Sequence, residues 1–265
     1  MGHQRLGRLP AHRLLPDIVR YLVAGGTPTE DLVQQITEIG QDSLAHGLKE
    51  PVFIHAIWLL VRIPQAMASP DFVSELKKLD VTLTPSADLP EVLVAFDDAL
   101  ERVQRRSQSG GSDLGEIARH AAISAMAEAT RLPTLWDPNA NDVRASVAIL
   151  RGPERFGEMA QRFFAGFVER VIHYFIDRNL HEMVGPRRVN RSLNEVTDFN
   201  AGIRRHCDEA SLIMRVFAKD WLGKNHYKLR NQITPITVAG FARHTVKKMR
   251  IELDRRRGNL AVISH

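Results

Sequence analysis

The residues best suited to chemistry are two histidines and an aspartate, His173, Asp177 and His181, which follow one another at intervals of four. Residues at this spacing lie on one side of a helix, on successive turns. Two imidazoles and a carboxylate could bind a metal ion, and such an ion could activate water for hydrolysis. The alternative is structural, because Asp177 can hydrogen-bond the histidines and the helix dipole favours a cationic His181 near a helix end. We therefore keep the trio only as candidate metal ligands.

The one cysteine of the chain, Cys207, stands beside His206, Asp208 and Glu209, and this run looks catalytic when it is read consecutively. Consecutive residues on a helix point in different directions, however, and Cys207 belongs to an apolar stripe. Burial raises the pKa of a thiol and suppresses the reactive thiolate, so we predict a buried structural cysteine. A single thiol also excludes an internal disulfide framework and is typical of a reducing compartment, so we expect a cytoplasmic protein.

No other motif in the sequence specifies a reaction. We find no glycine-rich phosphate loop, no dinucleotide fingerprint, no paired-histidine zinc helix and no nucleophile elbow. Ser74 and Lys77 have the spacing of a catalytic serine–lysine pair, but they stand in a charged segment without its usual companion motifs. We therefore predict no catalytic residue, no cofactor and no resident metal.

Basic residues accumulate towards the C-terminus. Residues 1–100 hold 8 Lys/Arg against 13 Asp/Glu, residues 101–185 hold 11 against 11, and residues 186–265 hold 17 against 7. A charge distribution polarised in this way favours an acidic partner at the C-terminal end, either nucleic acid or an acidic protein subunit. A solvated face that serves only solubility is the remaining alternative.

Several groups of basic residues in this region could contact such a partner. One group precedes a predicted helix start at Ser192, where free backbone amides and arginines could together hold a phosphate. A second group surrounds Tyr227, and the third lies on the last predicted helix. The candidate binding residues are Arg187, Arg188, Arg191, Lys224, Lys228, Arg230, Arg243, Lys247, Arg250, Arg255, Arg256 and Arg257.

The segment from Thr237 to Arg257 resembles helix-turn-helix sequences, with residues 237–243 in the place of the first helix. It departs from that pattern at His244 and Thr245, which make too short a turn and include no glycine. We therefore predict one continuous helix. Its apolar face would be formed by Ala239, Ala242, Val246, Met249 and Leu253, with Arg243, Lys247 and Arg250 opposite.

These side chains must be positioned by helices, because apolar residues recur at helical intervals through most of the chain. Capping signals support this pattern, such as Asp88 followed by Glu91 at the third helical position. The predicted helices span residues 14–24, 28–46, 51–63, 70–79, 90–107, 113–131, 141–150, 153–183, 192–222 and 235–257. The fold class is thus an all-α, irregular bundle of roughly nine to ten helices with little or no sheet, and residues 80–85 are the best strand candidate.

Two of these predicted helices have informative apolar stripes. The helix over 153–183 is apolar around much of its circumference, which predicts a central position. The segment 192–222 carries one stripe at steps of three or four, which predicts a single long helix. That stripe comprises Val196, Phe199, Ile203, Cys207, Ala210, Met214, Phe217 and Trp221.

A run of glycines and serines at residues 107–112 separates two strongly helical parts and predicts a flexible linker. The predicted organisation is a flexible arm over 1–13, an acidic helical subdomain over 14–106, the linker, and a helical domain over 113–265 with the basic face. No apolar stretch reaches the roughly 20 residues that a bilayer span needs, so we expect no membrane partner.

The leading hypothesis is a non-catalytic helical subunit of a multi-component assembly, as a homo- or hetero-oligomer. It would bind nucleic acid or an acidic protein partner through its basic C-terminal third. The alternative is a metal-dependent or nucleic-acid-processing hydrolase that uses His173, Asp177 and His181. Convergence of these three side chains in an open cleft would favour the hydrolase.

Overall fold

The computed structural model describes residues 39–107, 111–130, 142–183, 193–228 and 233–263. Every regular element within these ranges is a helix, and the described residues form no strand, which confirms the all-α prediction. The segment from Asp80 to Pro85 is irregular, and Asp80 adopts a positive φ of 60°.

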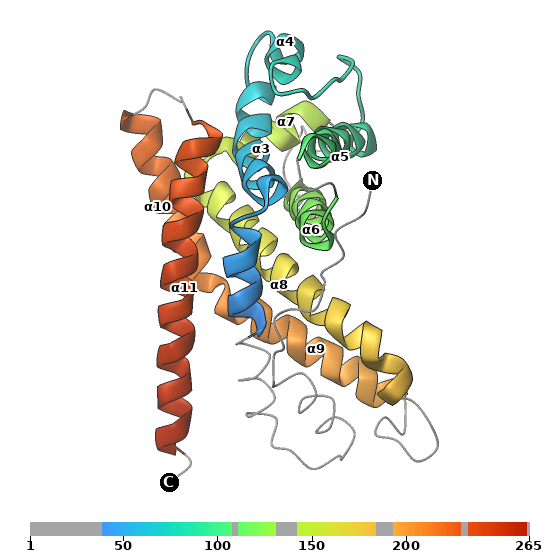
Figure 1. The fold of residues 1–265 in the computed structure, drawn as a ribbon. Coiled ribbons are helices and arrows are strands. Elements are labelled where there is room, and N and C mark those ends of the chain that lie inside the picture. The colour runs from blue at the N-terminus through green and yellow to red at the C-terminus, as the bar shows by residue number, and fades with distance from the viewer. Residues whose placement is uncertain (1–38, 108–110, 131–141, 184–192, 229–232, 264–265) are drawn as a thin grey trace.

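Figure 1 colours the helices by their order along the chain, from blue to red. Residues Ile39–Gly47 are helical and lead into the labelled elements. These are α3 (Pro51–Met67), α4 (Phe72–Lys77), α5 (Leu89–Arg106), α6 (Asp113–Thr130), α7 (Val143–Ala148), the 3-10 turn η1 (Ile149–Arg151), α8 (Pro153–Met183), α9 (Leu193–Ala210), α10 (Leu212–Lys228) and α11 (Pro235–Ile263). The predicted helix over 14–24 lies outside the described residues.

Helix α8 lies at the centre of the bundle, as its broad apolar circumference predicts, and packs against α3, α6, α9 and α10 (Figure 1). Its phenylalanines Phe163, Phe164 and Phe167 are fully buried around Phe53 of α3. Aromatic rings bury the largest apolar areas of any side chains, so this cluster anchors the core. The polar residues of α8 are therefore accessible only where no neighbouring helix packs against it.

The start of α5 shows why local sequence signals succeed in this protein. Asp88 Oδ1 accepts a hydrogen bond from the backbone amide of Glu91 at 2.9 Å, and Glu91 Oε2 accepts one from the amide of Asp88 at 2.8 Å. This is the predicted capping box, in which two side chains satisfy two backbone amides that the helix leaves free. The signal fixes where the helix begins.

The single long helix predicted over 192–222 is wrong, because the chain breaks at Ser211 between α9 and α10. Ser211 is fully buried, and its amide donates to the Cys207 carbonyl at 3.1 Å as α9 ends. After the break Met214 is fully buried, as the predicted stripe requires, and the next fully buried positions are Ala218 and Leu222, one residue later than the predicted 217 and 221. Beyond Met214 the buried side of α10 is therefore shifted by one residue from the predicted stripe.

A single hydrophobic core runs through the described helices from Ile39 to Val246. Helix α6 packs against α3 and α5 as well as against α8, so this core continues across the predicted linker. Ser112, at the end of that linker, is buried and donates a hydrogen bond to Glu50 Oε2 at 2.8 Å. Residues 1–13 and 108–110 lie outside the described residues, and the division into two domains stays a prediction.

Helix α3 runs past its predicted end at residue 63 to Met67, with Pro64 inside it. Most of its length is buried in the core. In the part of the chain that the structure describes, no single helix is long and apolar enough to cross a membrane. Residues Ile39–Gly47 and α3 reach that length only as a pair bent by 81°.

Candidate functional site

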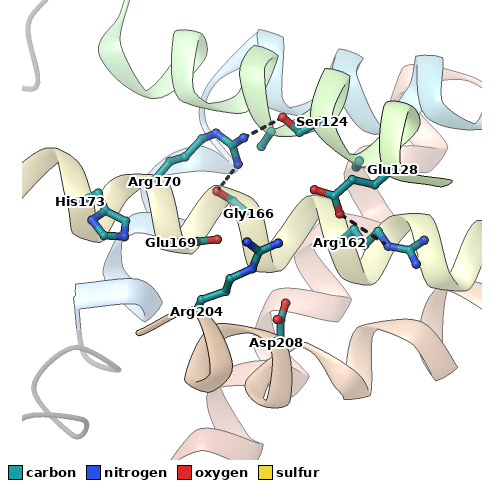
Figure 2. Close-up of a pocket in the computed structure, with 11 residues that line it drawn as sticks. Ser124, Glu128, Arg162, Gly166, Glu169, Arg170, His173, Arg204 and Asp208 are labelled. Atoms are coloured by element: carbon teal, nitrogen blue, oxygen red, sulfur yellow. Dashed lines mark hydrogen bonds and ion pairs between the residues drawn. The ribbon is translucent and has the colours of Figure 1, made fainter. Parts of the chain in front are cut away.

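A pocket of about 300 Å³ opens between α6, α8 and α9 (Figure 2). Its walls are formed mainly by charged and polar side chains that three separate stretches of the sequence contribute. The lining side chains that carry charge or hydrogen-bonding groups are Ser124 and Glu128 of α6, Arg162, Glu169, Arg170 and His173 of α8, and Arg204 and Asp208 of α9. Three guanidinium groups thus share the pocket with three carboxyl groups.

Arg170 is held in place on one side of the pocket. Its Nη2 donates to Ser124 Oγ at 2.7 Å, and its Nη1 donates to the carbonyl of Gly166 at 3.0 Å (Figure 2). A guanidinium with two such bonds keeps one orientation, because its donors form a rigid planar fork. Arg170 therefore contributes a fixed positive charge to the pocket.

Arg162 has fewer hydrogen-bond partners than Arg170. Its Nε lies 3.8 Å from Glu128 Oε2, which is an ion pair but too long for a hydrogen bond. Its Nη1 is buried and has no hydrogen-bond acceptor among the described residues. A buried donor without an acceptor costs free energy, which leaves the Arg162 guanidinium incompletely satisfied.

Arg204 and Asp208 reach the pocket from α9, one helical turn apart. Partial burial raises the pKa of the Asp208 carboxyl above its usual value, against the opposing effect of Arg204, and the charge of Glu128 adds to the rise. Arg204 is exposed, and within the described ranges no hydrogen bond or ion pair engages it. Figure 2 shows its guanidinium extended between Glu169 and Asp208.

The candidate metal trio is only partly described. His173 is half-buried and lines the pocket, four residues after Glu169. The backbone of α8 continues through Asp177 and His181, but their side chains lie outside the described residues. Among the side chains that the structure places, no three metal-binding groups come together. Metal binding by this trio thus stays the alternative hypothesis.

The basic C-terminal residues divide into those that the structure describes and those that it does not. Lys224, Arg243 and Lys247 are exposed. Lys228 and Arg250 are placed on α10 and α11 by their backbone alone, as are residues 255–257. Arg187, Arg188, Arg191 and Arg230 lie outside the described ranges.

On α11 the exposed basic residues form a surface that we call the α11 basic face: Arg243, His244, Lys247 and Lys248. Ala242 and Val246 are buried on the opposite side of the helix, as predicted. One continuous helix carries this surface, which confirms the absence of a helix-turn-helix break. His244 and Lys248 were not among the predicted binding residues, although their spacing from Arg243 and Lys247 places them on the same side of the helix.

Two basic residues of α10 form ion pairs with α8, in contrast to the described basic residues of α11. Arg215 pairs with Glu158 at 2.8 Å, and Lys219 pairs with Glu154 at 2.5 Å. No ion pair between described residues involves Arg243, Lys247 or Lys248. The charge of the α11 basic face is therefore uncompensated within this part of the structure.

A second pocket, of about 360 Å³, lies between α3, α5 and the loop after α4. Burial lowers the pKa of His55 in its wall, with an opposing effect from Asp80. Asp80 is engaged by Arg106 at 3.2 Å and by Arg102, which donates to its carbonyl. The charged groups of this pocket are thus already paired, in contrast to those beside α9.

Cys207 is buried at the junction of α8 and α9, as predicted, and burial raises the pKa of its thiol far above the usual range. We expect a thiol-reactive dye to label it only as fast as the protein unfolds, because the thiolate is the reacting species. Labelling in increasing urea should follow the loss of helix measured by circular dichroism. Rapid stoichiometric labelling in buffer would contradict this and reopen the question of a catalytic thiol.

Comparison with known proteins identifies no relative: no family model matches the chain, and neither a curated protein nor a solved structure does. Function must therefore be argued from the side chains themselves. Two features of the described residues stand out, the uncompensated α11 basic face and the charged pocket beside α9.

Proposed function

We propose that the protein is a non-catalytic helical subunit of a larger assembly and binds nucleic acid through the α11 basic face. The observation that carries this proposal is that Arg243 and Lys247 project from one side of α11, one turn apart, without an ion pair among the described residues. Exposed arginine and lysine side chains in this state can form charge-assisted hydrogen bonds with phosphate oxygens.

The charge of α11 as a whole supports the proposal. The helix contains seven Lys/Arg and two Asp/Glu, a balance of +5 that equals the net charge of the entire chain. Its 29 residues correspond to a length of about 43 Å at the usual rise of an α-helix. In Figure 1 its C-terminal part extends away from the other described helices. A long positive helix of this kind would attract a linear polyanion along its length.

Nucleic acid fits this surface better than an acidic protein does. The centres of protein–protein interfaces are depleted of charged residues, lysine in particular, and are rich in aromatic and other apolar side chains. The α11 basic face consists of an arginine, a histidine and two lysines, and the exposed Ile251 borders it one turn after Lys247. Such a composition suits contacts with a phosphate backbone, and an acidic protein partner becomes the competing outcome of the test.

The test combines Arg243→Gln with Lys247→Gln, because glutamine removes the charge and keeps good helix propensity. Binding of a labelled duplex DNA and of a labelled single-stranded RNA is measured by fluorescence anisotropy over a range of salt concentrations. Each phosphate contact on duplex DNA contributes about −0.9 to the slope of log affinity against log salt. Loss of two contacts should therefore make the slope shallower by about 1.8.

The matched control combines Lys77→Gln with Lys78→Gln at the end of α4, which removes the same charge from two exposed lysines elsewhere on the surface. The control should retain the slope of the unaltered protein. An equal change in both variants would mean that only net charge matters and would overturn the proposal. So would failure of the unaltered protein to bind either nucleic acid at low salt. If the protein instead co-purifies with an acidic subunit that the α11 variant loses, the surface is a protein interface.

A further inference from the structure

A second inference, independent of the proposed function, concerns the pocket between α6, α8 and α9. We propose that this pocket binds a small phosphorylated polyol, with the phosphate group held by Arg162 and Arg204 and the hydroxyl groups by neighbouring carboxylates (Figure 2). The proposal depends on donors in the pocket that have no acceptor, on acceptors beside them, and on the size and polarity of the space.

The unsatisfied donors favour an oxyanion. Arg162 makes no hydrogen bond in the described part of the chain, only the 3.8 Å ion pair with Glu128, and Arg204 has neither a hydrogen bond nor an ion pair there. The two residues come from different helices, α8 and α9, and both line the same pocket. A phosphate has enough oxygen atoms to accept from both guanidinium groups at once, and such charge-assisted bonds are among the strongest that side chains make.

Arg170 makes the site partly preorganised. Its bonds to Ser124 Oγ and to the Gly166 carbonyl fix a third positive charge on the wall of the pocket. A charge that is already oriented pays no further ordering cost when an anion enters. Arg170 therefore contributes to the electrostatic attraction even without a direct contact.

The carboxyl groups of the pocket favour hydroxyl groups on the part of the ligand that does not carry the phosphate. Glu169 and Asp208 line the pocket beside Arg204, and Figure 2 shows the Arg204 guanidinium between them. A bare anion would be repelled by them, whereas hydroxyl groups donate hydrogen bonds to carboxylates. The combination therefore fits a molecule with a phosphate at one end and hydroxyl groups at the other.

The size and polarity of the pocket agree with such a ligand. A volume of about 300 Å³ is at the lower end of the range for small-molecule sites and suits a compact ligand. Its apolar lining consists of Ala121 and Ala125, with no phenylalanine, tyrosine or tryptophan, and the one aromatic ring in the lining is the imidazole of His173. A nucleobase would thus find little to pack against, and a polyol finds hydrogen-bonding partners instead.

The experiment measures binding of glycerol 3-phosphate, inorganic phosphate and glycerol to the full chain by isothermal titration calorimetry. We expect glycerol 3-phosphate to bind more tightly than inorganic phosphate, since only the former offers hydroxyl groups to the carboxylates, and we expect no binding of glycerol. Arg204→Gln should weaken glycerol 3-phosphate binding by at least about tenfold, the loss expected for one charge-assisted hydrogen bond.

Arg205→Gln is the matched control, because Arg205 is the next residue on α9, is also exposed and does not line the pocket. It should leave the affinity unchanged within about twofold, a shift well below that of one lost hydrogen bond. Both variants should retain the unfolding temperature of the unaltered protein, since neither residue makes a hydrogen bond or an ion pair with a described side chain. Equal effects of the two variants, or no binding of either phosphate compound, would overturn the proposal. Duplex DNA binding should be unaffected by Arg204→Gln, which separates this site from the α11 basic face.

Discussion

Replacing Phe53 with alanine should lower the free energy of unfolding by about 3 to 5 kcal/mol. Phe53 is fully buried, and its ring lies 5.2 Å from that of Phe163, 5.9 Å from that of Phe164 and 4.9 Å from that of Phe167, measured between ring centroids. The substitution removes one ring from the contact between α3 and α8 and leaves a cavity that these rings cannot fill without moving. Such a loss is a large fraction of the stability of an ordinary domain.

Urea unfolding followed by circular dichroism measures this effect directly. Val94→Ala on α5 is the control, because Val94 is 60% exposed and shortening it should change stability by less than about 0.5 kcal/mol. A loss below about 1 kcal/mol for Phe53→Ala would contradict a tightly packed aromatic cluster, since cavities in rigid cores cost more than that.

The aromatic core could be predicted from the sequence because it depends on the period of one helix. Phe156, Met159, Phe163 and Phe167 recur at steps of three or four residues, and all four are buried. The start of α5 could be predicted for a similar reason, since the capping box at Asp88 is a contact between residues three apart. Features that depend only on the local spacing of residues could therefore be predicted from the sequence.

The break at Ser211 could not be predicted from the sequence, because the spacing of apolar residues continues unchanged from α9 into α10. Ala210 and Met214 are buried and four residues apart, as in a continuous helix. Further along α10, Ala218 and Leu222 are fully buried, whereas their neighbours Phe217 and Trp221 are half-buried. Small and large apolar residues stand at both sets of positions, so tertiary packing decides between them.

The charged pocket was missed because it depends on which polar faces meet. Arg162 and Arg204 each belong to the polar side of an amphipathic helix, which usually faces solvent. Nothing in the spacing within α8 or α9 indicates that these two sides border the same cavity. The sequence placed His173 in a candidate metal site with Asp177 and His181. In the structure it lines the pocket together with Glu169 and Arg170.

Counting charges along the chain overestimates the free positive charge of the C-terminal third. Arg215 and Lys219 belong to that count, but Glu154 and Glu158 of α8 neutralise them. The pairing arises because α10 packs along α8, a contact between segments about sixty residues apart. The described basic residues of this third that have no ion pair are Arg204 and Arg205 on α9, Lys224 on α10, and Arg243, Lys247 and Lys248 on α11. The proposed function depends on the group on α11.

The close approach of α8 and α10 leads to the last prediction, which concerns Gly157. A Cβ atom at this position would lie 2.6 Å from the backbone carbonyl oxygen of Arg215 and 3.3 Å from Cβ of Lys219. The first of these neighbours is backbone, so α10 would have to move away from α8. We expect Gly157→Ala to lower the free energy of unfolding by about 1 to 3 kcal/mol, the usual cost of overpacking.

Gly223→Ala on α10 is the matched control, because a Cβ there would meet no described atom within 4 Å. Alanine is the better helix former by about 1 kcal/mol, so this variant should gain stability of up to that amount. The two substitutions are chemically identical, and unfolding in urea should shift in opposite directions. Moreover, displacement of α10 in Gly157→Ala should weaken the pairs of Arg215 and Lys219 with α8, so that its loss of stability shrinks at high salt. A gain of stability in both variants would show that α10 is free to move, and the tight contact between α8 and α10 would then not be a source of stability.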